Sequence, residues 1–342
     1  MLYVPVVSST GKPLMPCHPA RARELVRNKK AVRRFSKGLF YIQLLERKDG
    51  AVQPVACGID PGSKKEGFTV KSAEKTFLNV QADAVTWVKE AVNTRRMMRR
   101  GRRNRNTPCR ASRMNRSRSG LAPSTKARWQ WKLRLSRWLS KLYPISIFVV
   151  ENIKARTKGQ RKWDVSFSPL QIGKNWFYGE LSRLAEVQIK NGWETKEMRD
   201  TLGLKKTKNK MSEVFEAHCV DSWVLAASAV GGMIPDNTQM ACVTPIHFHR
   251  RQLHVLQPTQ GGIRKSHGGT RSLCFKRGSI VKHPKHGVVH VGGTMGGRLS
   301  LHSRMDGNRL CRNAKPSDCK FLAYASFRMR LLPGLQSGVS AA

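Results

Sequence analysis

Three acidic residues and one histidine stand where a folded chain can bring their side chains together. Asp60 ends an apolar run and is followed by Pro-Gly, and Glu151 ends a second apolar run. His218 and Asp221 lie three residues apart in a stretch with a helical pattern, so both side chains project from one helix face. Two strand ends and one helix face are therefore enough to assemble a four-residue site.

These residue types favour metal-dependent hydrolysis of a phosphodiester. The reaction needs a neutralised pentavalent transition state, an activated water and a stabilised leaving oxygen, and two Mg²⁺ ions about 4 Å apart supply all three. Asp60, Glu151 and Asp221 offer the hard carboxylate oxygens that Mg²⁺ prefers, and Mn²⁺ is an acceptable substitute. His218 can take the proton of the attacking water near neutral pH or stabilise the intermediate. We therefore expect all four residues to be catalytic and the three acids to be the metal ligands.

Each of these residues also has an ordinary structural interpretation when it is considered alone. Asp60 can cap a turn, Glu151 can begin a loop, and His218 can be a core histidine with a satisfied hydrogen bond. The ordered set, in a chain of net charge +43, favours the catalytic interpretation.

The charge of the chain indicates the class of its partner. Lys and Arg number 64 against 21 Asp and Glu, which gives a pI near 11.0. Self-repulsion of this size requires a polyanion, so the expected partner is nucleic acid. A membrane surface is the alternative, but no lipidation signal or basic amphipathic anchor accompanies the charge.

Arginines are most concentrated at 95–118, a stretch that contains no acid. Arginine dominates lysine there, which suits bidentate contacts with phosphates, and the pattern before it is helical. A disordered basic segment is the alternative, but the run lies between stretches that we expect to fold. The residues expected to bind nucleic acid are Arg95, Arg96, Arg99, Arg100, Arg102, Arg103, Arg105, Arg110, Arg113, Arg250 and Arg251.

The remaining composition is typical of a cytoplasmic protein. The eight cysteines include no Cys-x-x-Cys pair, so we expect reduced, mostly structural thiols and no zinc knuckle. No leader pattern begins the chain, and no apolar run approaches 18 residues.

The order of the elements predicts an α/β fold with an RNase H-like core. The expected elements of this core are strands at 54–60, 66–72, 75–81 and 145–151 and helices at 175–190 and from 211 onward. The proline-dense segment 13–19 predicts irregular structure. Short alternating runs with glycine turns at 240–342 predict a small β-barrel or SH3-like domain.

Three short motifs together resemble a RuvC endonuclease that is split into three parts. They are Gly58-Ile-Asp60-Pro-Gly, Val149-Val-Glu151 and His218-Cys-Val-Asp221, in the order found in the transposon-encoded IscB family. The segment 11–25 is similar to that family's N-terminal PLMP segment, 95–118 resembles its arginine-rich bridge helix, and 249–254 resembles the stretch after the third RuvC part. Only 67 positions separate the second and third motifs, which leaves no room for the usual HNH domain and matches the HNH-lacking branch, IsrB.

This resemblance implies an RNA-guided enzyme that opens duplex DNA and nicks the non-target strand through a single RuvC site. It implies a monomeric protein bound to a large structured guide RNA, in a prokaryotic cytoplasm and on the nucleoid when it acts. The implied domains are a PLMP domain at 1–53, RuvC part I at 54–91, the bridge helix at 92–120, RuvC part II with connecting helices at 121–210, RuvC part III at 211–239, and a C-terminal β-rich domain at 240–342 that interacts with a motif adjacent to the target.

Two other functions are compatible with parts of this pattern. A guide-independent resolvase of DNA junctions would share the acids but would not need the long arginine helix. A non-enzymatic RNA-binding protein would need only the charge.

Overall fold

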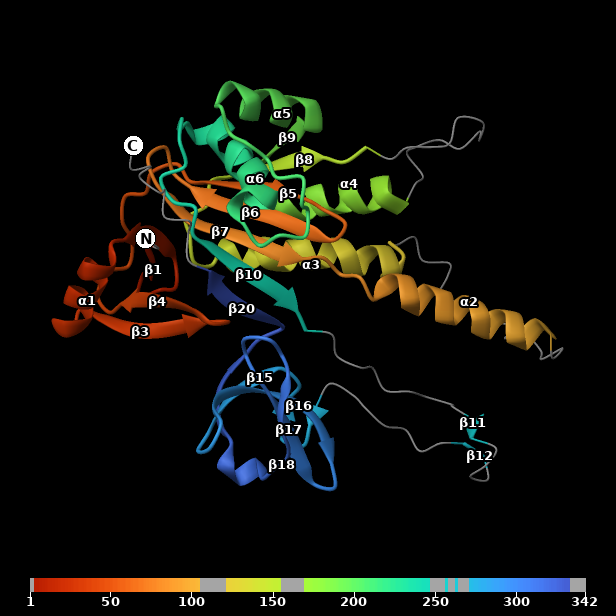
Figure 1. Cartoon of the computed structure of the whole chain (residues 1–342). Helices are drawn as coiled ribbons and strands as arrows, with labels where there is room; N and C mark the ends of the chain where they lie inside the picture. The colour runs from red at the N-terminus through yellow and green to blue at the C-terminus, as the bar shows by residue number, and fades with distance from the viewer. Residues whose placement is uncertain are drawn as a thin grey trace, which may run out of the picture. The chain divides into compact units, whose positions relative to one another are not determined.

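The computed structural model describes residues 3–104, 121–154, 169–246, 256–257, 262–263 and 271–332. The chain forms two compact units (Figure 1). The first comprises Met1–Arg33, Tyr41–Met240 and Leu332–Ala342, and the second comprises Arg34–Phe40 and Ala241–Leu331.

The chain begins with a four-stranded sheet and one helix. The elements are β1 Val4–Val7, β2 Pro13–Cys17, α1 Pro19–Arg27, β3 Ala31–Ser36 and β4 Leu39–Leu44, and the strand order is β2-β1-β4-β3. The prediction of irregular structure at 13–19 was wrong, because β2 is an edge strand and an edge strand tolerates proline. Pro19 begins α1, where its missing N–H does no harm, and the His18 side chain accepts a hydrogen bond from the Ala20 N–H.

The central sheet of the first unit contains five neighbouring strands in the order β7-β6-β5-β8-β9. Their bounds are β5 Ala56–Asp60, β6 Lys65–Lys71, β7 Thr76–Asp83, β8 Ile147–Asn152 and β9 Glu186–Asn191. β5, β6 and β7 form an antiparallel meander, whereas β8 is parallel to both β5 and β9. This mixed topology is the RNase H-like arrangement, so the predicted fold class is confirmed.

Among the residues that the structure describes, five helices accompany this sheet: α2 Val88–Asn104, α3 Pro123–Leu139, α4 Pro169–Leu181, α5 Gly192–Thr201 and α6 Phe215–Val230. α5 and α6 lie on one side of the sheet, and α3 lies on the other (Figure 1). The predicted helix at 175–190 was too long, because α4 ends at Leu181 and the chain then enters β9. None of the described helices is long and apolar enough to cross a membrane.

The second unit is rich in β-structure, as the sequence predicts. Its main sheet is antiparallel, with the order β18-β17-β16-β15-β19. The bounds are β15 Ser279–His283, β16 Gly287–Met295, β17 Arg298–His302, β18 Arg309–Ala314 and β19 Lys320–Tyr324. Buried side chains such as Val281, Val291 and Leu301 form its core. Two further strands, β10 Met240–Pro245 and β20 Phe327–Leu332, are neighbours in a sheet.

Candidate active site

The sheet register places Asp60 and Glu151 side by side. Ile59 of β5 pairs with Val150 of the parallel strand β8, so the next residue on each strand is one of the two acids. Asp60 is also paired with Gly67 of β6. Paired residues on neighbouring strands direct their side chains to the same face of a sheet. The carboxylates of Asp60 and Glu151 therefore lie on one face, at the end of the two central strands.

Two glycines allow α6 to lie directly on that face. A Cβ at Gly58 would collide with the carbonyl oxygen of Ser222 and would lie 2.7 Å from the backbone nitrogen of Ala226. A Cβ at Gly67 would lie 2.9 Å from the carbonyl carbon of His218 and closer still to its oxygen. Side chains larger than hydrogen are excluded at both positions, and this close approach brings the start of α6 next to Asp60.

A buried hydrogen-bond network fixes α6 on the sheet. The hydroxyls of Thr69 and Ser222 are 2.8 Å apart, and Thr69 also donates to the side-chain oxygen of Asn79 at 3.0 Å. Asn79 in turn donates to the carbonyl of Asn237 at 2.8 Å. Because these groups are buried, a sliding movement of the helix would leave several of them unpaired.

His218 lies against Asp60 with one ring nitrogen facing it. Its Nε2 is 3.0 Å from the carbonyl oxygen of Lys210, and a carbonyl can only accept, so Nε2 carries the proton in the neutral ring. Its Nδ1 is 3.6 Å from a carboxylate oxygen of Asp60, is buried, and has no hydrogen-bond partner among the described residues. Nδ1 therefore presents a lone pair to the site, as a proton acceptor must.

Asp221 is held by two basic residues that the sequence analysis did not select. Arg199 of α5 donates to one carboxylate oxygen at 2.7 Å, and the ammonium group of Lys206 contacts the other. The Asp221 side chain is only 4% exposed, so both contacts are made in a largely water-free setting. The structure thus brings all four predicted residues together and adds Arg199 and Lys206 to them.

The pKa values of the site residues reflect both burial and nearby charge. Burial, followed by the nearby carboxylates of Asp60 and Asp221, raises the pKa of Glu151 to about 7, although Lys206 and Arg199 oppose the shift. Burial alone would lower the pKa of Lys206, but Asp60, Asp221 and Glu151 outweigh it and raise that pKa. Added positive charge would therefore stabilise the ionised form of Glu151.

The donor set fits a divalent cation in its chemistry. Asp60, Glu151 and Asp221 supply carboxylate oxygens whose mutual repulsion a cation would relieve. As the side chains stand, no three His, Cys, Asp or Glu residues in the described part of the chain are close enough to hold a metal ion. Asp221 is directed toward Arg199 and Lys206, which supply positive charge instead.

A buried ion pair supports the same end of the sheet from the opposite face. Glu66 precedes Gly67, so its side chain points away from α6, and it accepts a hydrogen bond from Lys132 of α3 at 2.6 Å. Burial raises the pKa of Glu66 to about 7, against the effect of Lys132, and Asp60 adds to the rise. Two features of the sequence could have indicated this ion pair. Glu66 is a single acid at the start of an apolar strand, and Lys132 is one lysine among the tryptophans and leucines of a buried helix face.

The arginines of helix α2 are exposed where their side chains are described. Arg95, Arg96, Arg99, Arg100 and Arg103 all lie at the surface. The side chain of Arg102 and the whole of Arg105, Arg110, Arg113, Arg250 and Arg251 lie outside the described residues. The Nε groups of Arg95 and Arg99 donate to carbonyls four residues earlier, at 3.1 and 3.3 Å.

Residues 4–166 match the family model described as RRXRR protein. The match includes Asp60, Glu151 and α2 but ends before α6. Within it, residues 99–103 read Arg-Arg-Gly-Arg-Arg, which agrees with the pattern in the family's name.

Two solved structures of low similarity were also found. One is T. thermophilus RuvC in complex with a Holliday junction substrate, at 15% identity and a TM-score of 0.27, covering 50% of this chain and 90% of that chain. The other is the yeast mitochondrial Holliday junction resolvase Ydc2, at 13% identity and a TM-score of 0.27, covering 54% of this chain and 80% of that chain. Similarities of this size assign no function. No curated protein matches the chain.

Proposed function

We propose that this protein is an RNA-guided DNA endonuclease that nicks the non-target strand of duplex DNA at one metal-dependent, RuvC-type site. The observation that carries the proposal is the convergence of Asp60, Glu151, His218 and Asp221 at one end of an RNase H-like sheet. The RRXRR match over 4–166 and the resemblance of the three motifs to the IsrB branch support it.

The site residues divide into metal ligands and a base. Asp60, Glu151 and Asp221 would hold two Mg²⁺ ions, which when bound neutralise the phosphate and make a water nucleophilic. His218 takes a proton at Nδ1, the nitrogen that faces Asp60, while the Lys210 carbonyl fixes its ring through Nε2. Arg199 orients Asp221 through its hydrogen bond.

The proposal gives the basic segments the role of holding nucleic acid. The exposed arginines of α2 bind phosphates of the guide RNA or of the guide–target duplex, and the β-rich second unit interacts with a motif beside the target. The domain roles follow the boundaries proposed from the sequence: PLMP at 1–53, RuvC parts at 54–91, 121–210 and 211–239, the bridge helix at 92–120, and the motif-reading domain at 240–342. One RuvC site in a monomer cuts one strand.

The test is a supercoiled plasmid that carries a target matching the guide RNA. The guide is taken from RNA that co-purifies with the protein expressed from its native locus. With protein, guide and Mg²⁺, we expect open-circular product whose nick maps to the non-target strand. Asp60→Asn should abolish nicking and leave DNA binding nearly intact, because metal ligands act mainly on the transition state. Asp49→Asn, which removes an exposed acid that pairs with Lys12, is the matched control and should nick normally.

Four results would contradict the proposal. Linear product at early times would contradict a single-strand nickase. Cleavage of a four-way junction without guide RNA would favour the guide-independent resolvase. Full activity of Asp60→Asn would remove that residue from the site, and no cleavage under any condition would favour an RNA-binding protein.

A further inference from the structure

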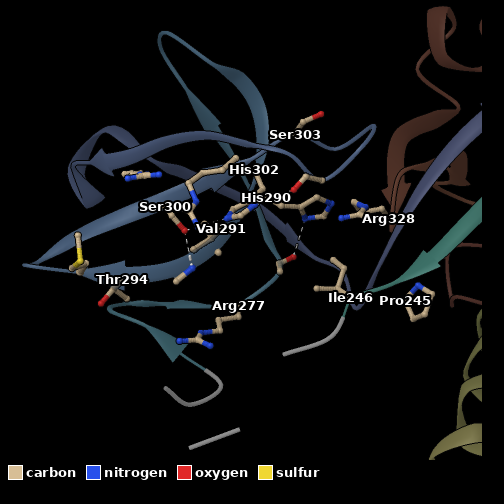
Figure 2. A pocket seen from close by; sticks show the side chains of 17 residues that line it. Pro245, Ile246, Arg277, His290, Val291, Thr294, Ser300, His302, Ser303 and Arg328 are labelled. Carbon is tan, nitrogen blue, oxygen red and sulfur yellow. Dashed lines mark hydrogen bonds between the residues drawn. The ribbon is translucent and has the colours of Figure 1, made fainter. Parts of the chain in front are cut away.

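The second unit contains a cavity of about 660 Å³ that lies outside the proposed cleavage site (Figure 2). Its volume falls within the range of roughly 300–1,000 Å³ that is common for small-ligand sites. Apolar residues such as Ile246 and Val291 line part of it. No acid occurs among its described lining residues, which include four arginines: Arg277, Arg309, Arg312 and Arg328.

Two glycines keep the cavity open and allow polar groups to line it. A Cβ at Gly292 would lie 2.6 Å from the Ser300 hydroxyl and would collide with the His302 ring. A Cβ at Gly307 would collide with the guanidinium of Arg328, and Gly307 also has a φ of +80°, which favours glycine. The neighbouring Gly293 differs, because nothing lies within 4 Å of its Cβ position.

The polar wall of the cavity is preorganised by a chain of hydrogen bonds. The His302 Nδ1 donates to the carbonyl of Gly307 at 3.1 Å, so its neutral ring accepts from the Ser300 hydroxyl at Nε2, 3.2 Å away. The Ser300 hydroxyl also accepts from the Gly293 N–H at 2.9 Å. The Ser300 hydroxyl thus both donates and accepts a hydrogen bond, so the wall has one defined arrangement before any ligand binds.

Hydrogen-bond donors and an acceptor line different parts of this cavity (Figure 2). Arg277 is held by its Nε, which donates to the Ser272 hydroxyl at 3.3 Å, and the Nε of Arg328 is buried without a hydrogen-bond partner in the described residues. His290 donates from Nδ1 to the Gly278 carbonyl at 3.3 Å. The pKa of His290 falls to about 4, mainly because the ring is buried and in part because positive charges, among them Arg328, lie near it. At neutral pH the His290 ring is therefore uncharged, and its Nε2 can accept a hydrogen bond.

We propose that this cavity binds one unpaired nucleotide of a nucleic-acid strand. Its phosphate lies on the guanidinium group of Arg328, whose planar fork matches phosphate oxygens and whose buried Nε lacks a hydrogen-bond partner among the described residues. Its base lies on the apolar side near Ile246, with the acceptor of His290 available to a base amino group or a hydroxyl. The four arginines and the absence of acids among the described lining residues favour an anionic ligand. This site is independent of the cleavage chemistry.

The test measures binding of small probes to the full-length protein by isothermal titration calorimetry. The probes are the four nucleoside 3′,5′-bisphosphates, their 2′-deoxy counterparts and inorganic pyrophosphate. We expect saturable binding of one bisphosphate per chain, at least about tenfold weaker in Arg328→Gln and in Gly292→Ala. Arg271→Gln removes the same charge from an exposed position outside the cavity, and Gly179→Ala in α4 adds the same methyl group in open space outside the cavity. Both controls should bind as the wild type does.

The outcomes separate a built site from general charge attraction. Equal weakening in Arg328→Gln and Arg271→Gln would overturn the proposal, as would pyrophosphate binding as tightly as every bisphosphate. A preference for the ribose series assigns the nucleotide to RNA, and a preference for the deoxyribose series assigns it to DNA. Thermal melting of each variant identifies loss of folding, and the Arg328→Gln result decides if Gly292→Ala does not fold. No cleavage is measured, so these results do not depend on the nuclease proposal.

Discussion

The substitution Gly58→Ala tests how α6 brings the catalytic residues to the sheet. The new Cβ would lie 2.7 Å from the backbone nitrogen of Ala226, whereas ordinary contact begins at 3.4 Å. The helix must therefore move by at least 0.7 Å at Ala226, and by more at Ser222, whose carbonyl oxygen lies closer. Both obstacles are backbone atoms of a helix, so no change of side-chain rotamer relieves the collision. The movement passes directly to Asp221, the residue before Ser222.

Two measurable losses follow from this movement. Overpacking of a well-packed interface costs about 1–3 kcal/mol in the free energy of unfolding. The displaced helix also breaks the 2.8 Å contact between Ser222 and Thr69 and moves Asp221 and His218 relative to Asp60. A misplacement of about 1 Å can reduce a catalytic rate about 10²-fold. We therefore expect lower stability together with a nicking rate reduced by roughly two orders of magnitude.

Urea denaturation measures the first effect, and single-turnover nicking by the guide-loaded protein measures the second. Gly179→Ala in α4 is the matched control, because Gly179 is exposed and nothing lies within 4 Å of its Cβ position. That variant should be more stable by about 0.5–1 kcal/mol, as alanine is in a helix, and should nick normally. Wild-type stability and wild-type nicking in Gly58→Ala would show that α6 does not sit on β5 in this way.

Three further predictions concern charge. In EDTA, Glu151 favours folding below pH 4.5, and this contribution is lost as the pH rises to about 7. The reason is that the raised pKa of Glu151 lets the folded protein keep a proton that the unfolded chain releases. Glu151→Gln should lack this part of the pH dependence in urea denaturation. Lys132→Met should lower the free energy of unfolding by about 3–5 kcal/mol, since it leaves Glu66 buried without its partner. Adding Glu66→Gln should restore part of the loss. A change in the free energy of unfolding below about 1 kcal/mol would mean that the pair is not buried in solution. Replacing Arg99 and Arg103 by alanine should weaken DNA binding equally for all sequences. In a plot of the logarithm of the binding constant against the logarithm of the salt concentration, the slope should become smaller by roughly 0.9 for each duplex phosphate that the variant no longer neutralises. An unchanged slope would place α2 outside the interface.

The first strands of the core could be predicted from the sequence because local signals agree there. The predicted strands 54–60, 66–72 and 75–81 correspond to β5, β6 and β7, and each strand end agrees within two residues. Each is an apolar run between turn residues, and a buried strand leaves that pattern regardless of its neighbours. The two acids at strand ends follow from the same pattern, since a carboxylate after an apolar run marks the edge of a sheet.

Other parts depend on contacts that no local pattern records. β9 has exposed and half-buried residues, and pairing with β8 decides its structure more than its own composition does. The importance of Gly58 and Gly67 becomes visible only when α6 is placed against them. Arg199 and Lys206 belong to a stretch that reads as a polar helix and a basic loop, and only the packing of α5 beside α6 directs them to Asp221.

The contacts of Asp221 also explain why the carboxylates do not surround one point. Lys206 and Arg199 both bind Asp221, while burial, followed by the charges of Asp60 and Asp221, raises the pKa of Glu151. A divalent cation held by Asp60, Glu151 and Asp221 would meet the same need for positive charge. It would therefore compete with Lys206 for Asp221, and ionisation of Glu151 would be linked to its binding. If the protein has the proposed function, the basic loop that carries Lys206 stabilises the folded site without metal and releases the Asp221 carboxylate when metal binds.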